Sequence, residues 1–213
     1  MCVIDAVHGN KDKQHTYREQ CLKYNKAVKE EFYCEAILIS YAMIEDRLRS
    51  FLYHIGALAN RNSEKVNCKK TNAQLKAIVL EYKTEKENES LGIKKISGKI
   101  TIIRCTLEWV ADVAGGYKED KYLSTLKKQY EGNIDIQDMQ NTLKKLSVWL
   151  DYRNEIVHGL LNKNIDNLNL HLKETALQGM MIARKIDSYV RQVKKGNYIR
   201  RSVNLCTERN IKK

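Results

Sequence analysis

The sequence predicts an all-α protein, a bundle of four long helices with shorter helices and loops between them. It contains no proline and ten glycines in 213 residues, so the residues that end helices and form tight turns are scarce. Apolar residues recur at alternating steps of three and four along four separate stretches, and this spacing places each set on one face of a helix. Four such stripes are typical of long helices packed side by side.

The stripes and the segments between them follow one another in a clear order. A helix is expected at 17–31, either short and separate or continuous with the helix of the first stripe, and others around 73–82 and 122–130, whereas the polar segments 60–72 and 84–95 predict loops. The four stripes are Ile37, Tyr41, Ile44, Leu48, Phe51, Ile55 and Leu58; Ile96, Ile100, Ile103, Leu107, Val110 and Ala114; Met139, Leu143, Leu146, Leu150, Val157 and Leu160; and Ile165, Leu168, Leu172, Ala176, Gly179, Ala183, Ile186, Val190 and Val193. The second stripe is followed by Gly115 and Gly116, a typical helix end.

The domain organisation follows from these stripes. We expect a single helical domain over residues 1–195, with an elaborated middle at 61–133, and a basic C-terminal tail at 196–213. Basic residues number 38 against 26 acidic ones, a net charge of +12, and residues 194–213 contribute seven basic residues and one acidic residue. Such an excess favours a polyanion or an anionic membrane surface as partner. A solubilising tail, or a last helical turn that packs through Tyr198, Ile199 and Val203, is the alternative.

The cysteines and histidines do not form a metal-binding pattern. The six cysteines are far apart, with no C-x-x-C pair among them, and the five histidines are scattered. Reduced thiols in the cytosol are the simplest interpretation, and the first residues lack the features of a signal peptide. The apolar runs, such as that at residues 36–39, are too short to span a membrane. We therefore expect a cytoplasmic protein with no metal, no cofactor and no membrane partner.

The third stripe is interrupted where its spacing requires an apolar residue. After Leu150 the alternation predicts an apolar residue at 153 or 154, but the sequence has Arg153 and Asn154 before Val157. An arginine on a core-facing stripe is costly unless a carboxylate or an anionic ligand meets it. A buried Arg–carboxylate pair that fixes the helix register is one explanation, and a functional anion site is the other.

Helical geometry brings a histidine into the same region. His158 lies one turn after Asn154, so these two side chains share a face. Arg153 is about 140° away from His158 around the helix axis, but its long side chain can swing toward the histidine near a helix end. Gly159 and the polar segment 162–164 predict that the helix ends close to His158. A guanidinium, an amide and an imidazole at the mouth of a cleft suit the binding of a phosphate.

The segment Arg153-Asn154-Glu155-Ile156-Val157-His158-Gly159 resembles the R-x4-6-H motif of the HEPN superfamily, in the form Arg, polar residue, three others, His. In that superfamily the motif lies late in a helical bundle and is followed by a further long helix, as it is here. The resemblance covers roughly residues 35–59 and 135–195. It implies a prokaryotic toxin or antiviral-defence ribonuclease, with RNA as its substrate.

The resemblance implies RNA cleavage without a metal, in which the ribose 2′-hydroxyl attacks the adjacent phosphate and leaves a 2′,3′-cyclic phosphate and a 5′-hydroxyl. His158 would accept the proton, since an unperturbed imidazole titrates at a pH of about 6.5. Arg153 would stabilise the developing charge, and Asn154 would orient the phosphate or the imidazole. Glu45, at the edge of the first stripe, would hold Arg153 in place, or else pair with Arg49 on the helix surface.

The resemblance also has implications for partners. In related enzymes two copies of the motif meet across a dimer, so we expect a homodimer with a composite active site, and an antitoxin or regulatory protein as a further partner. In relatives paired with nucleotidyltransferase antitoxins the motif continues as R-x4-H-x-Y; Leu160 departs from this form, so modification of a tyrosine there is not implied. Contacts with RNA phosphates are expected from the basic residues near the fourth stripe, which are Lys163, Lys194, Lys195, Arg200 and Arg201.

A second segment, Arg49-Ser50-Phe51-Leu52-Tyr53-His54, has the same R-x4-H spacing. It lies inside an unbroken apolar stripe, and we interpret it as a chance match. Two other classes of function stay open. One is a HEPN-like module that binds RNA or a nucleotide without cutting it, and the other is a protein-interaction bundle in which Arg153 is structural.

Overall fold

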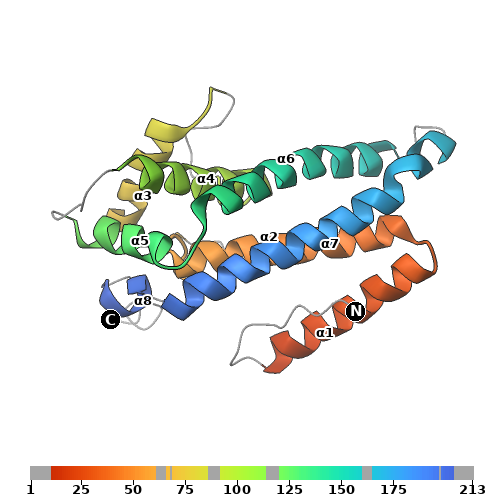
Figure 1. Cartoon of the computed structure of the whole chain (residues 1–213), viewed down its shortest axis with the longest axis horizontal. Coiled ribbons are helices and arrows are strands. Elements are labelled where there is room, and N and C mark those ends of the chain that lie inside the picture. The colour runs from red at the N-terminus through yellow and green to blue at the C-terminus, as the bar shows by residue number, and fades with distance from the viewer. Residues whose placement is uncertain are drawn as a thin grey trace. The chain divides into compact units, whose positions relative to one another are not determined.

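The computed structural model describes residues 11–60, 66–67, 69–85, 92–113, 120–159, 165–196 and 198–203, most of which lie in helices (Figure 1). The helices are α1 (Lys11–Lys29), α2 (Tyr33–His54), α3 (Lys69–Tyr82), α4 (Ile96–Asp112), α5 (Lys121–Glu131), α6 (Ile136–Gly159), α7 (Ile165–Gly196) and α8 (Tyr198–Ser202). Across these ranges the structure contains an isolated β-bridge between Leu58 and Val66 but no strand, which confirms the predicted all-α bundle. No helix among the described residues has the length and apolar character needed to cross a membrane.

Several helix boundaries differ from the predicted ones. α1 and α2 are separate helices, because the backbone of Glu31 adopts a φ of 62°, in the left-handed region, and ends the helical path between them. α2 ends at His54, although the last members of its stripe are buried beyond it. α3 begins at Lys69, inside a segment predicted to be a loop. α4 ends at Asp112, and the glycine pair at 115–116 that predicts its end lies outside the described residues.

The chain divides into two compact units. Unit 1 comprises residues 1–45 and 144–188, and unit 2 comprises residues 46–143 and 189–213. The divisions fall within α2, α6 and α7. α8 belongs to unit 2, and its Ile199 is fully buried, so the helical fold continues to Ser202 and includes the first part of the predicted tail.

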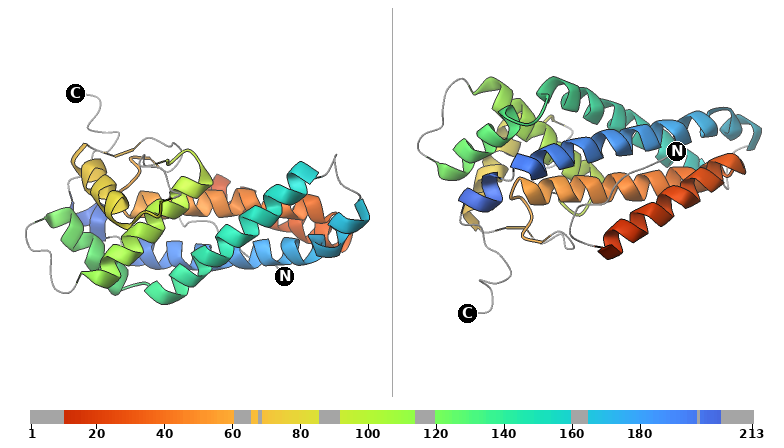
Figure 2. Two further views of the ribbon diagram at one scale, coloured as in Figure 1. Left: turned by 90° about the horizontal axis from the view of Figure 1, so that it is seen from above. Right: turned by 60° about the horizontal axis from the view of Figure 1, so that its bottom comes forward.

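Unit 1 consists of α1 and the portions of α2, α6 and α7 that belong to this unit (Figure 1, Figure 2). The hydroxyl of Tyr24 on α1 donates a hydrogen bond of 3.1 Å to the carbonyl oxygen of Ala176 on α7. Nε1 of Trp149 on α6 donates to the carbonyl oxygen of Thr175 at 2.7 Å. A Cβ atom at Gly179 would lie 2.6 Å from the Trp149 ring. Glycine at this position therefore permits the close approach of α7 to α6 in the core.

In unit 2, hydrogen bonds from the side chain of Gln129 link α8 to the C-terminal ends of α2 and α7. Its side chain is fully buried. Its Nε2 donates to the carbonyl oxygens of His54 at 3.3 Å and Val193 at 3.4 Å, and its Oε1 accepts a hydrogen bond of 3.1 Å from the backbone N–H of Ile199. One amide thus satisfies backbone groups of α2, α7 and α8, which would be costly to bury without partners.

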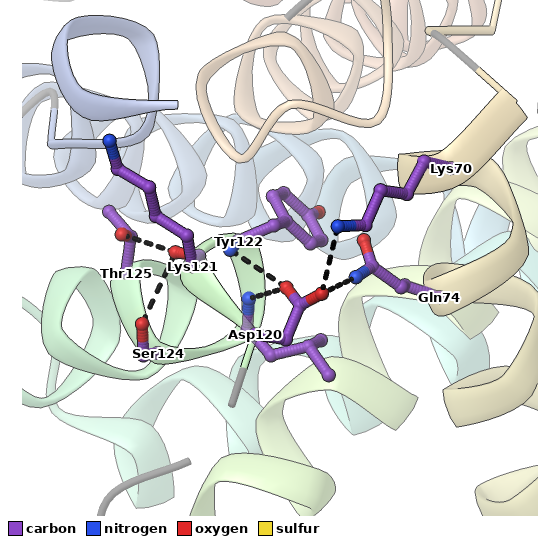
Figure 3. A network of polar contacts seen from close by, with 8 residues as sticks. Lys70, Gln74, Asp120, Lys121, Tyr122, Ser124 and Thr125 are labelled. Carbon is purple, nitrogen blue, oxygen red and sulfur yellow. Dashed lines mark hydrogen bonds and ion pairs between the residues drawn. The ribbon is translucent and has the colours of Figure 1, made fainter. Parts of the chain in front are cut away.

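Asp120 has a similar role between α5 and α3 of the same unit (Figure 3). Its carboxylate accepts hydrogen bonds from the backbone N–H groups of Tyr122 at 2.8 Å and Leu123 at 3.1 Å, and so caps the N-terminus of α5. The same carboxylate accepts a hydrogen bond from Nε2 of Gln74 and forms an ion pair of 3.5 Å with Lys70, both on α3. This side chain therefore fixes the start of α5 and links it to α3.

Candidate functional site

The interruption of the third stripe falls on Arg153. In α6, Leu146, Trp149 and Ile156 are buried, and Arg153 lies on the same stripe at steps of three and four. Arg153 is half-buried, whereas its neighbour Asn154 is exposed. The guanidinium side chain therefore takes a position that an apolar residue would occupy in an uninterrupted stripe, and α6 remains regular through it.

Two neighbours in unit 1 hold the Arg153 guanidinium. Its Nη1 donates a hydrogen bond of 3.0 Å to Oδ1 of Asn154. Its Cζ lies 4.3 Å from the centroid of the Tyr41 ring on α2, a distance at which cation–π attraction operates. Its Nε is buried and has no hydrogen-bond partner among the described residues. Because a buried, unpaired N–H group costs about 1–3 kcal/mol, this nitrogen is a candidate to donate to a ligand.

The role predicted for Glu45, to hold Arg153 in place, stays a prediction. Glu45 is half-buried and lies one turn after Tyr41 on α2. The described partners of the guanidinium are Asn154 and the Tyr41 ring. An aromatic face attracts a guanidinium without the cost of burying a carboxylate, so Tyr41 contributes to holding Arg153.

His158 lies in the last turn of α6 and is exposed. Asn154, one turn earlier, is exposed as well, so these two side chains share a solvent-facing side of the helix, as predicted. Among the described residues, no hydrogen bond, ion pair or ring contact joins His158 to Arg153 or to another side chain. The structure thus leaves the imidazole accessible, while Arg153 points against α2.

The second R-x4-H segment places its histidine inside the protein. His54 is buried at the end of α2, with its ring 5.3 Å from the ring of Tyr53 in an edge-on arrangement. Arg49 is half-buried, and its Nε is buried without a hydrogen-bond partner in the described part of the chain. This segment therefore offers no exposed imidazole.

The basic residues predicted to bind RNA lie in different surroundings. Lys195 and Arg201 are exposed, and Lys194 is half-buried. Lys163 lies outside the described residues. The exposed pair, near the ends of α7 and α8, is available to a polyanion.

Arg200, in contrast, is built into unit 2. Its Nε and Nη2 both donate to the carbonyl oxygen of Tyr53, at 3.0 and 2.6 Å, and Nη2 also donates to the carbonyl oxygen of Leu58. Its Cζ lies 3.7 Å from the centroid of the Tyr53 ring. Carbonyl groups at a helix end lack partners within the helix, and Arg200 supplies a charged donor to the carbonyl of Tyr53 at the end of α2 and to that of Leu58 in the segment that follows. Arg200 therefore has a structural role, and its contact with RNA stays a prediction.

Tyr41 is the site residue that sequence reasoning missed. It is the one member of the first stripe that is not purely apolar, and this was the available signal. A cavity of about 660 Å³ also lies in unit 1, but it contains none of the predicted site residues. Its lining residues are Glu31, Phe32, Tyr33, Cys34, Glu35 and Leu172.

No family model matches the chain, and neither the curated proteins nor the solved structures contain a significant match to it. Function must therefore be inferred from the residues of the chain, above all from those on α2 and α6.

Proposed function

We propose that this protein is an endoribonuclease of the HEPN kind, which cleaves RNA by attack of a ribose 2′-hydroxyl on the adjacent phosphate. The observation that carries this proposal is the pairing on α6 of a half-buried arginine, fixed by Tyr41 and Asn154, with an exposed histidine five positions later. The products are a 2′,3′-cyclic phosphate on one fragment and a 5′-hydroxyl on the other.

Each residue of the motif has a distinct role in this reaction. His158 accepts the proton of the 2′-hydroxyl, for which an accessible imidazole is required. Arg153 donates hydrogen bonds to the phosphate oxygens on which negative charge develops. Asn154 holds the guanidinium through its Oδ1 atom and leaves its amide nitrogen to bind a phosphate oxygen.

The homodimer that we propose follows from the resemblance to the HEPN superfamily. Arg153 is directed toward Tyr41, whereas His158 is exposed at the end of the helix. A second copy of the motif would supply the acid that protonates the departing 5′-oxygen, so that two copies form one composite site. The setting we propose is a toxin or antiviral-defence system, with an antitoxin or regulatory protein that controls the activity.

Incubation of the purified protein with end-labelled single-stranded RNA in EDTA tests the proposal. The wild-type protein should cleave, and the new 3′ ends should resist phosphatase until acid opens the cyclic phosphate. Arg153→Ala and His158→Ala should be inactive. His171→Ala and Arg18→Ala are matched controls, because both residues are exposed and lie outside the motif.

Two results would count against this function. Cleavage that is lost in EDTA and restored by magnesium would contradict the mechanism. Tight RNA binding by a folded wild-type protein that leaves the RNA intact would instead support the non-catalytic RNA-binding module.

A further inference from the structure

Tyr41 differs from the other members of the first stripe in its surroundings. It is half-buried on α2, and its ring lies under the guanidinium of Arg153. An apolar side chain would satisfy the packing of α2 equally well at this position. An aromatic face additionally attracts a cation and keeps it from turning toward solvent.

The Tyr41 ring covers one face of the guanidinium, and the nitrogen atoms on its edges differ in their partners. Nη1 is used by Asn154, and Nε has no partner among the described residues. Nε and Nη2 form the edge that donates two parallel hydrogen bonds to carboxylate or phosphate oxygens. Because Nε is buried, a ligand reaches this edge when the side-chain torsions of Arg153 change, and the ring face still attracts the guanidinium in its new orientation.

A second arginine stacked on a tyrosine ring shows how such a guanidinium binds an oxygen atom. In unit 2, Arg200 lies over the Tyr53 ring, and its Nε and Nη2 both donate to one carbonyl oxygen. In unit 1, Arg153 lies over the Tyr41 ring, and the corresponding Nε has no described acceptor. Among the described residues, the Nε of the stacked arginine in unit 2 therefore has an oxygen acceptor, although its Nη1 is buried without a hydrogen-bond partner, whereas the Nε of Arg153 has no acceptor.

We propose that Tyr41 is a positioning residue, whose ring holds Arg153 so that its Nε–Nη2 edge binds a phosphate of the RNA backbone. This inference rests on the proposed function, because it assigns the phosphate to an RNA substrate. Tyr41 itself does not touch the reacting atoms; it acts through the guanidinium. The ring is the required feature, and the hydroxyl is not.

Three variants test this role. Tyr41→Phe keeps the ring, Tyr41→Leu removes it but keeps an apolar side chain, and Tyr33→Leu makes the same change two turns earlier on α2. Thermal melting establishes that each variant is folded. In cleavage assays Tyr41→Leu should lower kcat/KM by about tenfold, because a guanidinium that is not held over the ring binds the phosphate less well in the ground state and in the transition state. Tyr41→Phe and Tyr33→Leu should both match the wild type.

A second measurement does not depend on cleavage. In protein labelled with ¹⁵N-arginine, the Nε–H signal of Arg153, assigned by its loss in Arg153→Lys, should carry a ring-current shift in the wild type and in Tyr41→Phe but not in Tyr41→Leu. Addition of an RNA with 2′-O-methyl groups, which cannot be cleaved, should move this signal in the first two proteins and not in the third.

The two assays separate failure of this inference from failure of the proposed function. If the wild type does not cleave RNA, the proposed function fails, and the Nε–H signal still decides the role of Tyr41. The positioning role is overturned if Tyr41→Leu gives the wild-type signal and the wild-type response to RNA. It is also overturned if Tyr41→Phe loses as much cleavage activity as Tyr41→Leu. The hydroxyl of Tyr41, rather than its ring, would then be the feature that cleavage requires.

Discussion

The two R-x4-H segments of this chain, residues 49–54 on α2 and 153–158 on α6, share a spacing but place their histidines in opposite environments. Both arginines are half-buried, and both carry a buried Nε that has no hydrogen-bond partner in the described part of the chain. His54 is 1% exposed, whereas His158 is exposed at the end of its helix. The burial of the arginines therefore does not distinguish the two segments, but the exposure of the histidines does.

This difference has a direct chemical consequence. A general base must come within hydrogen-bond distance of the proton that it removes, roughly 2.6–3.2 Å between heavy atoms. An exposed imidazole such as that of His158 can approach an RNA hydroxyl, whereas that of His54 lies in the core of unit 2. The carbonyl oxygen of His54 also accepts a hydrogen bond from Gln129, so the end of this segment is part of the structural framework. The spacing of the motif does not identify a site unless the helix also presents the histidine to solvent.

The largest expected effect separates the two histidines. His158→Ala should lower the cleavage rate by at least about a hundredfold, the contribution typical of a general base. His54→Ala should leave the rate per folded molecule unchanged but lower the free energy of unfolding by about 2 kcal/mol, because it empties space in a buried region. Single-turnover cleavage in EDTA and thermal melting measure the two quantities separately.

Equal loss of activity in folded His54→Ala and His158→Ala would overturn the comparison. It would mean that exposure does not decide which histidine reacts. An unchanged rate in His158→Ala would instead remove the α6 segment from the chemistry.

The next effect concerns the two arginines. Arg153→Ala should lower kcat by about 10²–10³-fold, as expected when one preorganised donor to a developing negative charge is lost. Arg153→Lys keeps the positive charge but loses the planar pair of donors, so it should recover little of that activity. Arg49→Ala and Arg49→Lys, made in parallel, should retain the wild-type kcat. Full activity of Arg153→Lys would show that charge alone is required at this position.

The sequence predicts the all-α fold class well, because the apolar periodicity specifies helices, and the same periodicity selects a candidate position for the site. The apolar stripes identify the long helices, and the missing apolar residue after Leu150 identifies a position where the packing is exceptional. The structure assigns that exception to Arg153. It also places Trp149 in the core, on the same stripe as Arg153.

The partners of the charged residues are not encoded in that periodicity. A buried arginine–carboxylate pair was one explanation for Arg153, but such a pair occurs at Arg47, which is fully buried and lies 2.5 Å from Asp46. Arg153 contacts Tyr41 on another helix, and Arg200 contacts carbonyl groups more than a hundred positions earlier in the chain. Contacts of this range depend on how the helices pack, which a single stripe does not specify.

A smaller effect tests the structural surroundings of the 49–54 segment. Arg200→Ala should lower the free energy of unfolding by about 2 kcal/mol, because the carbonyl oxygens of Tyr53 and Leu58 lose a charged donor. Arg201→Ala, the exposed neighbour, should change it by no more than about 0.5 kcal/mol. Urea titrations measure both values. Cleavage by folded Arg200→Ala should equal that of the wild type; weaker RNA binding at unchanged stability would support the predicted contact of Arg200 with RNA.

The smallest effect concerns the residues that follow α8, and it asks whether they help the α6 segment to capture RNA. Truncation after Val193 would not answer this, because it removes the buried Ile199 together with Arg200. Truncation after Val203 keeps α8 and removes three basic residues, Arg209, Lys212 and Lys213. Each phosphate contact that is lost should reduce the slope of log Kd against log salt by about 0.7 for single-stranded RNA. Melting temperature and kcat at saturating RNA should stay at their wild-type values, because neither α8 nor the Arg153 and His158 side chains are altered. An unchanged slope would leave these three residues without a role in RNA capture and would confine phosphate binding to the helices.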